Sequence, residues 1–375
     1  MIPFNKPYYS GTEIEHIREA FAGGQTAGNG PFTRRCQEFF ESRYGLGKCL
    51  LTQSCTDALE MTALLAGIEA GDEVILPSYT FVSTANAFAL RGAKLVFCDS
   101  EADRPHIDAG AVAGLVTDRT KAIVVVHYGG TAVEMEPVMA VAKERGILVI
   151  EDAAQAIDSF YHGRALGGIG DLATFSFHET KNVISGEGGL LVINRADLIE
   201  RAEVLWEKGT NRSAFFRGEV AKYQWVDVGS SFLPSELTAA TLWAQLEHLE
   251  SIQARRMGIW QAYDAVLRPA AERLGFGVPL VNYGETVNGH LYYVLCESLE
   301  ERTELIGWLR DRGIYAVFHY QSLHDSPYFA GKHDGRKLQW ADRYSDSLVR
   351  LPLFHELGEA GAEGIAAEVI RFFEK

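Results

Sequence analysis

The amino-acid sequence predicts an α/β protein with a mostly parallel seven-stranded sheet containing one antiparallel strand, followed by a smaller α+β domain. Three observations lead to this prediction. Short apolar runs alternate with helix-like stretches over the first half of the chain, as in repeated βαβ units. Several runs are rich in Val and Ile without polar alternation, which is typical of strands covered on both faces. The pattern then changes near residue 235.

Seven apolar runs are the predicted strands of the large sheet. The helix-like stretches between them include 56–68 and 134–145. Only residues 179–188 separate the last two runs, which is short for a crossover connection between parallel strands. We therefore predict that the last strand pairs antiparallel or lies at the sheet edge. The runs are KCLLT (48–52), EVILPS (73–78), KLVFCD (94–99), AIVVVH (122–127), ILVIED (147–152), ATFSFH (173–178) and GLLVIN (189–194).

The C-terminal part of the chain is predicted to form the smaller domain. A long helix is expected over 235–266, with leucines along one surface. We predict a large domain over 1–248 and a small domain over 249–375. The elements expected in the small domain are the apolar runs 290–298 and 314–320 and the helix-like stretches 301–313 and 357–374.

Composition and charge restrict the class of protein. Hydrophobic residues make up 47% and charged residues 23%, as in ordinary globular proteins. The net charge of −15 argues against a nucleic-acid partner, although a local pocket can still bind a small anion. The five cysteines are scattered singly, so neither a zinc site nor a disulfide framework is indicated. Without an apolar membrane span or a signal-peptide pattern, we expect a cytoplasmic protein with no membrane partner.

Residues at the carboxyl ends of the predicted strands are the candidate ligand-binding residues, because ligands of open α/β sheets bind there. After the first run, Ser54, Cys55 and Thr56 open a helix whose free N–H groups and hydroxyls can hold a phosphate. Ser176, at the end of the sixth run, offers another hydroxyl. Phe81 offers a flat face for a ring.

Asp152 and Lys181 complete this set. Asp152 ends a buried strand, where an unpaired carboxylate would be costly, and Lys181 supplies an amine just beyond FSFH. A phosphate site, a ring platform, a carboxylate and a lysine together suit pyridoxal phosphate (PLP), which enzymes hold as a lysine Schiff base with a carboxylate at the pyridine nitrogen. Each residue alone has a plainer interpretation: Ser54, Thr56 or Asp152 as a helix cap, Phe81 as core, Lys181 as surface. The prediction depends on all of them meeting at one sheet edge.

Two further segments are candidates for substrate binding. KGTNRSAFFRG supplies Asn211, Arg212 and Arg217, and arginine suits a diphosphate through its fork of donors. VFHYQSLH places His319 and Tyr320 after a predicted strand of the small domain. For each of these residues, a solvated loop or a packed core position is an equally good interpretation.

A series of motifs also resembles a known family. In chain order they are SCTDAL, GDEVILPSYTFVSTANA, VHYGG, VIEDAAQA, TFSFHETKN, GEGG and VRLPLF. They resemble the sugar aminotransferases of the DegT/DnrJ/EryC1/StrS family over most of the chain. The opening IPFNKP and the stretches GNGPFTRRCQ and KGTNRSAFFRG are most similar to the subgroup that forms dTDP-4-amino-4,6-dideoxygalactose, the enterobacterial-common-antigen type.

The resemblance implies the PLP-dependent aspartate aminotransferase fold (fold type I) and a homodimer with active sites shared between subunits. It implies that Lys181 is the Schiff-base lysine, that Asp152 pairs with the pyridine nitrogen and that Gln155 donates to the hydroxyl oxygen of the ring. Many relatives have Gly or Ala at Cys55, and many have an asparagine where this chain has Leu233. The remaining implied contacts are stacking by Phe81 and phosphate binding by Ser176, Thr56 and the amides around Cys55.

The implied reaction transfers an amino group from L-glutamate to C4 of TDP-4-keto-6-deoxyglucose. Transfer at C3, a UDP or GDP carrier and a gluco product are the alternatives within the family. Dehydratases of the family replace the lysine with histidine, so Lys181 argues against that activity. A PLP-binding regulator on the same fold would carry a DNA-binding appendage, and the sequence has no basic appendage.

Overall fold

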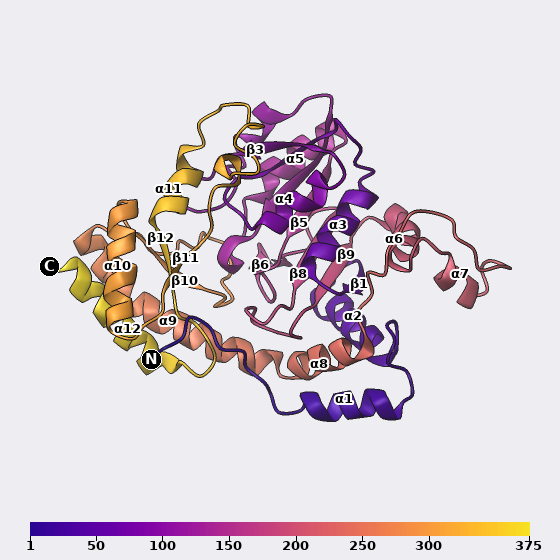
Figure 1. Cartoon of the computed structure of the whole chain (residues 1–375), viewed down its shortest axis with the longest axis horizontal. Helices are drawn as coiled ribbons and strands as arrows, with labels where there is room; N and C mark the ends of the chain where they lie inside the picture. The colour runs from indigo at the N-terminus through magenta and orange to yellow at the C-terminus, as the bar shows by residue number, and fades with distance from the viewer.

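The computed structural model describes all residues from 1 to 375 and contains a seven-stranded sheet with helices on both faces (Figure 1). The strand order is β1-β9-β8-β5-β4-β2-β3. β9 (Gly189–Ile193) pairs antiparallel with β1 (Lys48–Thr52) and with β8 (Leu172–Ser176), and the other strands run parallel. The predicted single antiparallel strand is confirmed, and it lies inside the sheet. The remaining strands are β2 (Glu73–Pro77), β3 (Lys94–Cys98), β4 (Thr120–Val126) and β5 (Leu148–Asp152).

Two apolar layers cover the large sheet. Along β4, Ile123 and Val125 join one layer while Ala122 and Val124 join the other, because successive strand side chains point to opposite faces. Both faces are therefore apolar, which explains the absence of polar alternation in the sequence. The first layer includes α2 (Pro31–Tyr44), α5 (Met135–Arg145) and α8 (Glu236–Glu247), and the second includes α3 (Cys55–Leu65), α4 (Val82–Ala89) and α6 (Ile199–Trp206).

The predicted helix over 235–266 is two helices in the structure. α8 ends at Glu247 and α9 (Leu249–Leu274) follows after His248, whose φ of −105° and ψ of 9° are not helical. α9 carries the chain from beneath the large sheet to the small one (Figure 1). None of the helices is both long and apolar enough to cross a membrane.

The small sheet contains three antiparallel strands in the order β10-β12-β11. Its apolar cluster joins residues of the sheet to α9, α10 (Leu299–Asp311) and α12 (Gly358–Phe373). The strands are β10 (Tyr292–Leu295), β11 (Val317–Phe318) and β12 (Leu348–Leu351). The other elements are the helices α1 (Glu13–Ala22), α7 (Arg212–Phe216) and α11 (Gln339–Ser347) and the short strands β6 (Phe160–Tyr161) and β7 (Arg164–Ala165).

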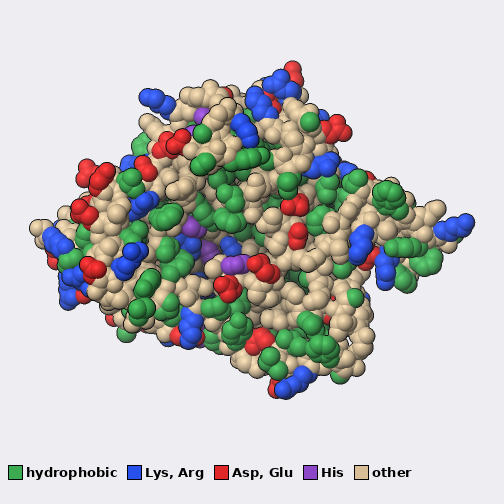
Figure 2. Space-filling view, viewed as in Figure 1, with side chains coloured by type: hydrophobic (Ala, Val, Ile, Leu, Met, Phe, Trp, Pro, Cys, Tyr) green, Lys and Arg blue, Asp and Glu red, His purple; other side chains and the backbone are tan.

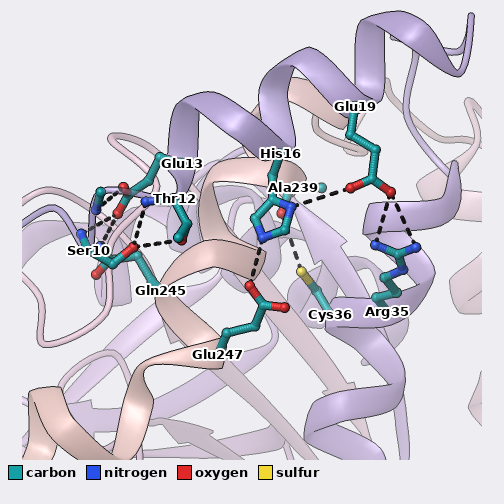
Figure 3. A network of polar contacts seen from close by, with 11 residues as sticks. Ser10, Thr12, Glu13, His16, Glu19, Arg35, Cys36, Ala239, Gln245 and Glu247 are labelled. Atoms are coloured by element: carbon teal, nitrogen blue, oxygen red, sulfur yellow. Dashed lines mark hydrogen bonds and ion pairs between the residues drawn. The ribbon is translucent and has the colours of Figure 1, made fainter.

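The N-terminal helix α1 lies along α8 and is held there by polar contacts (Figure 3). His16 Nε2 lies 2.6 Å from Glu247 Oε2, and Gln245 Nε2 donates to Glu13 Oε1 at 2.7 Å. Both partners on α8 lie in its last turn. The contacts therefore attach the start of the chain to the helix that leads toward the small sheet.

Residues before α1 cross to the small sheet. Ile2 N donates to Gly313 O at 2.7 Å, and Tyr315 N donates to Ile2 O at 3.0 Å. The ring of Phe4 lies 4.8 Å from the guanidinium carbon of Arg350 on β12. The first residues of the predicted large domain thus lie with the predicted small domain, and the division at 248/249 stays a prediction.

Candidate active site

A cavity of about 530 Å³ lies where the carboxyl ends of the large-sheet strands face the small sheet. Figure 2 shows histidine side chains gathered near a hollow in the middle of this face of the molecule. Residues of both predicted domains line the cavity, so a ligand bound there can contact both of them. The predicted site residues that line it are Ser54, Cys55, Thr56, Phe81, Asp152, Gln155, Ser176, Lys181, His319 and Tyr320.

The start of α3 forms one end of the cavity. Ser54 is the N-cap, and its Oγ accepts from Asp57 N at 3.0 Å, so the helix-cap interpretation is correct for this residue. Its hydroxyl proton is still available to a ligand. Thr56 Oγ1 lies 2.8 Å from Ser83 Oγ. Because the first-turn amides of a helix have no acceptor within the helix, this end of the cavity suits a phosphate.

Gly189 on β9 brings the strands close to this helix start. It pairs with Thr52 of β1 on one side and with Ser176 of β8 on the other. A Cβ at position 189 would lie 2.4 Å from the carbonyl oxygen of Ser54 and 2.5 Å from Cys55 N. Only glycine allows the backbone to approach this closely.

We expect Gly189→Ala to weaken PLP binding by about 5- to 150-fold, because overpacking of about 1–3 kcal/mol would displace the start of α3. The dissociation constant from an absorbance titration of the apoprotein measures this. Gly307→Ala is the matched control, since a Cβ there meets nothing within 4 Å. Equal affinity of the Gly189→Ala and wild-type proteins would contradict the expectation.

Asp152 places a buried carboxylate in the middle of the cavity lining. It is 5% exposed, and it accepts hydrogen bonds from Thr84 Oγ1 at 2.8 Å and from Ala154 N at 3.1 Å. Burial raises the pKa of Asp152, and the two hydrogen bonds and the nearby charge of Lys181 offset this only in part. A cation against Asp152 would restore the charged form. The sequence analysis did not single out Thr84.

Lys181 lies after β8 and is the one lysine among the residues that line the cavity. Burial lowers the pKa of its amine, and Arg350 lowers it further, while Cys55 and Asp152 act in the opposite direction. A lowered pKa increases the share of neutral amine, which is the nucleophilic form. Lys181 and Asp152 both line the cavity. The amine, the carboxylate and the helix start therefore fit PLP, with room for its ring among them.

Gln155 and Tyr320 form a hydrogen-bonded pair on the wall of the cavity. Gln155 Oε1 accepts from Gly129 N at 2.6 Å, and this orients Gln155 Nε2 to donate to the Tyr320 hydroxyl at 3.0 Å. The Tyr320 ring lies 6.0 Å from the ring of Phe81 at an interplanar angle of 42°. Gln155 thus presents a fixed N–H donor to the cavity.

His319 is held as a neutral imidazole. Arg350 Nη1 lies 3.0 Å from its Nε2, and arginine can only donate, so Nε2 accepts. His319 Nδ1 therefore carries the proton and donates to the Tyr128 hydroxyl at 2.8 Å. Burial, with the nearby charges of Arg350 and Lys181, lowers the pKa of His319 well below its usual value.

The cavity also contains residues that the sequence analysis missed. His290 Nδ1 lies 2.9 Å from Asn182 Oδ1, while Asn182 Nδ2 donates to Asn288 O at 2.9 Å. The amide oxygen must accept, so His290 carries its proton on Nδ1 and offers Nε2 as an acceptor. Arg350, His290 and Phe4 line the cavity from the small sheet and the N-terminal segment. The one available signal was that Arg350 and Phe4 fall within VRLPLF and IPFNKP.

The three predicted substrate residues of the KGTNRSAFFRG stretch lie away from the cavity of their own chain. They belong to an arm over 207–229 that projects from the body with α7 (Figure 1). Their side chains form hydrogen bonds and ion pairs with residues of the arm or of α6. The contacts are Asn211 with Lys222 O and Gln224 N, Arg212 with Glu207 at 3.7 Å, and Arg217 with Glu203 and Glu219 at 2.8 Å each.

Comparison with known proteins shows related chains that match this one over nearly their whole length. The profile of the DegT/DnrJ/EryC1/StrS aminotransferase family matches residues 7–370. The dTDP-4-dehydro-2,3,6-trideoxy-D-glucose 4-aminotransferase of Saccharopolyspora spinosa is 32% identical over 98% of this chain and 96% of its own. The aminotransferase TlmJ from Streptoalloteichus hindustanus is 32% identical with a TM-score of 0.90, covering 100% and 99% of the two chains. The PLP form of Spr1654 from Streptococcus pneumoniae, 24% identical, shares the fold with a TM-score of 0.89, covering 100% and 98%.

Proposed function

This chain belongs to the DegT/DnrJ/EryC1/StrS aminotransferase family, and on that premise we propose that it transfers the amino group of L-glutamate to C4 of TDP-4-keto-6-deoxyglucose. The chain is an aminotransferase, and its cofactor is PLP. When bound, PLP takes the amino group from one substrate and passes it to the next. The observation that carries the proposal is the single cavity lined by Lys181, Asp152 and the start of α3. The C4 assignment is supported by the likeness to a 4-aminotransferase of a dTDP sugar.

We assign the holding of the cofactor to residues of the large sheet. Asp152 would keep a proton on the ring nitrogen, because its buried carboxylate requires a cation. Gln155 would donate from Nε2 to the ring oxygen, and Phe81 would pack on the ring. The phosphate would be held by Ser54, Thr56 and Ser176 and by the amides around Cys55.

Lys181 has two roles in this proposal. Its Nζ binds the cofactor and, once released, takes a proton from the α-carbon of the amino donor. In the second half of the reaction, Nζ returns a proton to C4 of the sugar. The lowered pKa of Lys181 supports both roles, since the amine must be neutral to accept a proton.

We further propose a cytoplasmic homodimer with shared active sites. Phe216 and Trp225 on the arm are 70% and 81% exposed, and large exposed apolar groups on a projecting arm favour a protein contact. In the dimer, Asn211, Arg212 and Arg217 would bind the diphosphate of the sugar nucleotide in the partner's cavity. All five cysteines are free, which suits a reducing compartment.

The test of the reaction is to identify the product after incubation with glutamate and TDP-4-keto-6-deoxyglucose. We expect TDP-4-amino-4,6-dideoxygalactose and 2-oxoglutarate in equal amounts, measured by mass spectrometry and NMR. The control omits glutamate and should give no amino sugar. A 3-amino product, or a 4-amino product with gluco stereochemistry, would contradict the substrate or product assignment while leaving the cofactor assignment intact.

A further inference from the structure

His290 lies just before β10 and lines the same cavity as Lys181. Its side chain is buried, and its Nδ1 donates to Asn182 Oδ1 at 2.9 Å. The proton of the neutral ring is therefore on Nδ1, and Nε2 carries a lone pair that can accept a hydrogen bond. Burial lowers the pKa of His290 well below its usual value, and of the nearby charges that of Lys181 lowers it most. The ring stays neutral, so Nε2 remains an acceptor.

The chain leaves this acceptor to the cavity. His319, a second histidine of the cavity lining, has both ring nitrogens engaged, with Arg350 at Nε2 and Tyr128 at Nδ1. The ring of His290 is bonded to the chain through Nδ1, in its contact with Asn182. A polar atom withdrawn from bulk water is costly without a partner, so Nε2 calls for a donor inside the cavity.

Asn182 joins the His290 ring to the chain segment that carries Lys181. The two amide hydrogens of Asn182 are donated to Gln253 Oε1 and to Asn288 O, at 2.9 Å each. Its Oδ1 accepts from the His290 ring, and the backbone N of His290 donates to Asn288 Oδ1 at 3.0 Å. The residue that follows Lys181 in the chain and the His290 ring are therefore fixed relative to each other.

Two further contacts fix the backbone around His290 to other parts of the fold. Arg256 on α9 donates from Nη2 to His290 O at 2.9 Å. Asn288 Nδ2 donates to Gln155 O and to Ile157 O at 2.8 Å each, in the connection that follows β5. The ring of His290 is thus placed by α9 and by the large sheet before a ligand arrives.

The amine of Lys181 needs an acceptor if it is to have a fixed direction. A neutral lysine amine has two N–H donors and one lone pair at the end of a flexible four-carbon stem. To accept a proton from a substrate carbon, the lone pair must point at that carbon. An acceptor that holds one N–H prevents the amine from rotating. Once protonated, the amine has three donors, and the same acceptor stabilises its charge.

We propose that His290 is a positioning residue for Lys181, whose Nζ donates a hydrogen bond to His290 Nε2 whenever the amine is free. The proton taken from the substrate carbon stays on Nζ until Nζ returns it, and His290 neither gains nor loses a proton. The bond between Asn182 and His290 supports this pairing, because it holds the ring against the residue next to Lys181. The inference rests on the proposed aminotransferase function and adds one residue to its proton-transfer step.

Two substitutions in the holoenzyme separate the acceptor of His290 from its contact with Asn182. His290→Asn can place its amide nitrogen where Nδ1 lies, but it has no atom at the place of Nε2. His290→Gln reaches that place with its amide oxygen. We expect His290→Asn to lower the maximal single-turnover rate with glutamate by about 10- to 100-fold, the effect of losing a hydrogen bond to a charged group. His290→Gln should stay within about fivefold of wild type, and half-saturation by glutamate should change by less than about threefold in both variants.

Glutamate deuterated at the α-carbon makes the measurement specific to proton transfer. The isotope effect in His290→Asn should be as large as in wild type or larger, because the slowed step is the one that breaks this bond. An isotope effect that disappears would assign the loss to another step and overturn the proposal. The half-reaction with TDP-4-amino-4,6-dideoxygalactose should slow by a similar factor, since Lys181 moves the proton in both halves.

A spectroscopic measurement tests the hydrogen bond without turnover. Lys181 is joined to the cofactor in the pyridoxal form of the holoenzyme and free in the pyridoxamine form. We expect the ¹⁵N resonance of His290 Nε2 to move upfield from the first form to the second, as for a ring nitrogen that gains a hydrogen bond. The spectrum of His290→Gln identifies the resonance. Lys181→Ala loaded with pyridoxamine phosphate is the control, and there the resonance should stay at the position of an unbonded acceptor.

Three results would overturn the proposal. A wild-type rate in His290→Asn together with a slow His290→Gln would mean that the contact with Asn182 is the whole role of the ring. A loss confined to the sugar half-reaction would assign Nε2 to a sugar hydroxyl. An Nε2 resonance that is the same in both cofactor forms would show that Lys181 does not donate to it, and this comparison decides the question if the variants do not fold. Failure of the proposed function is a different result, because wild-type protein would then show no absorbance change with glutamate.

Discussion

Replacing Lys181 by alanine is expected to lower turnover by about 1000-fold or more. Lys181 supplies the single lysine amine among the residues that line the cavity, and Arg350 cannot replace it because a guanidinium does not give up its proton. The variant therefore loses both the group that binds the cofactor and the group that moves the proton. The measurement is the initial rate of 2-oxoglutarate formation with both substrates saturating.

Two further measurements make the Lys181→Ala result specific. Lys143→Ala, at an exposed position near the end of α5, should keep the wild-type rate. The absorbance of the holoprotein should change in Lys181→Ala, because the cofactor is no longer joined to the chain, and a small added amine should restore part of the rate. A Lys181→Ala protein with the wild-type rate and spectrum would show that the assignment is wrong.

Asp152→Asn is expected to lower turnover by about 100- to 1000-fold, the cost of removing one oriented electrostatic group from an active site. Asparagine has nearly the shape of aspartate and keeps one side-chain oxygen as an acceptor, so the fold should be preserved. It cannot hold a proton on the ring nitrogen as a carboxylate does, because it carries no charge. Single-turnover rates with glutamate and the melting temperature measure the two effects separately.

Thr84→Val is the companion to this variant. It removes the hydrogen bond to Asp152 Oδ2 but keeps the charge of the carboxylate. We therefore expect a smaller loss of rate than in Asp152→Asn. If Thr84→Val were the slower of the two, orientation rather than charge would be the contribution of Asp152.

The large sheet was predictable because its strands are buried on both faces. β4 and β5 alternate their side chains between two apolar layers, so each strand appears in the sequence as a continuous apolar run. The break at His248 was not predictable, since the residues on both sides are helical and a single non-helical residue leaves the apolar spacing almost unchanged. Helical periodicity does not detect an interruption of one residue.

The part of the site formed by strand ends was also accessible from sequence. Ser54, Asp152 and Ser176 follow or end parallel strands, and the topology of such a sheet brings those ends to one edge. Arg350 and Phe4 reach the cavity from the small sheet and from the start of the chain. No spacing in the sequence relates them to Lys181, because only the packing of the two sheets brings them together.

The pairing of Ile2 with the backbone at Gly313 and Tyr315 affects how the protein should be prepared for these experiments. An affinity tag fused ahead of Met1 would emerge beside the segment that positions Phe4 over Arg350. Lys375 follows α12 on the outer side of the small sheet (Figure 1). A purification tag placed after Lys375 leaves the cavity wall intact, so variant rates measured on such a protein report on the substituted side chain alone.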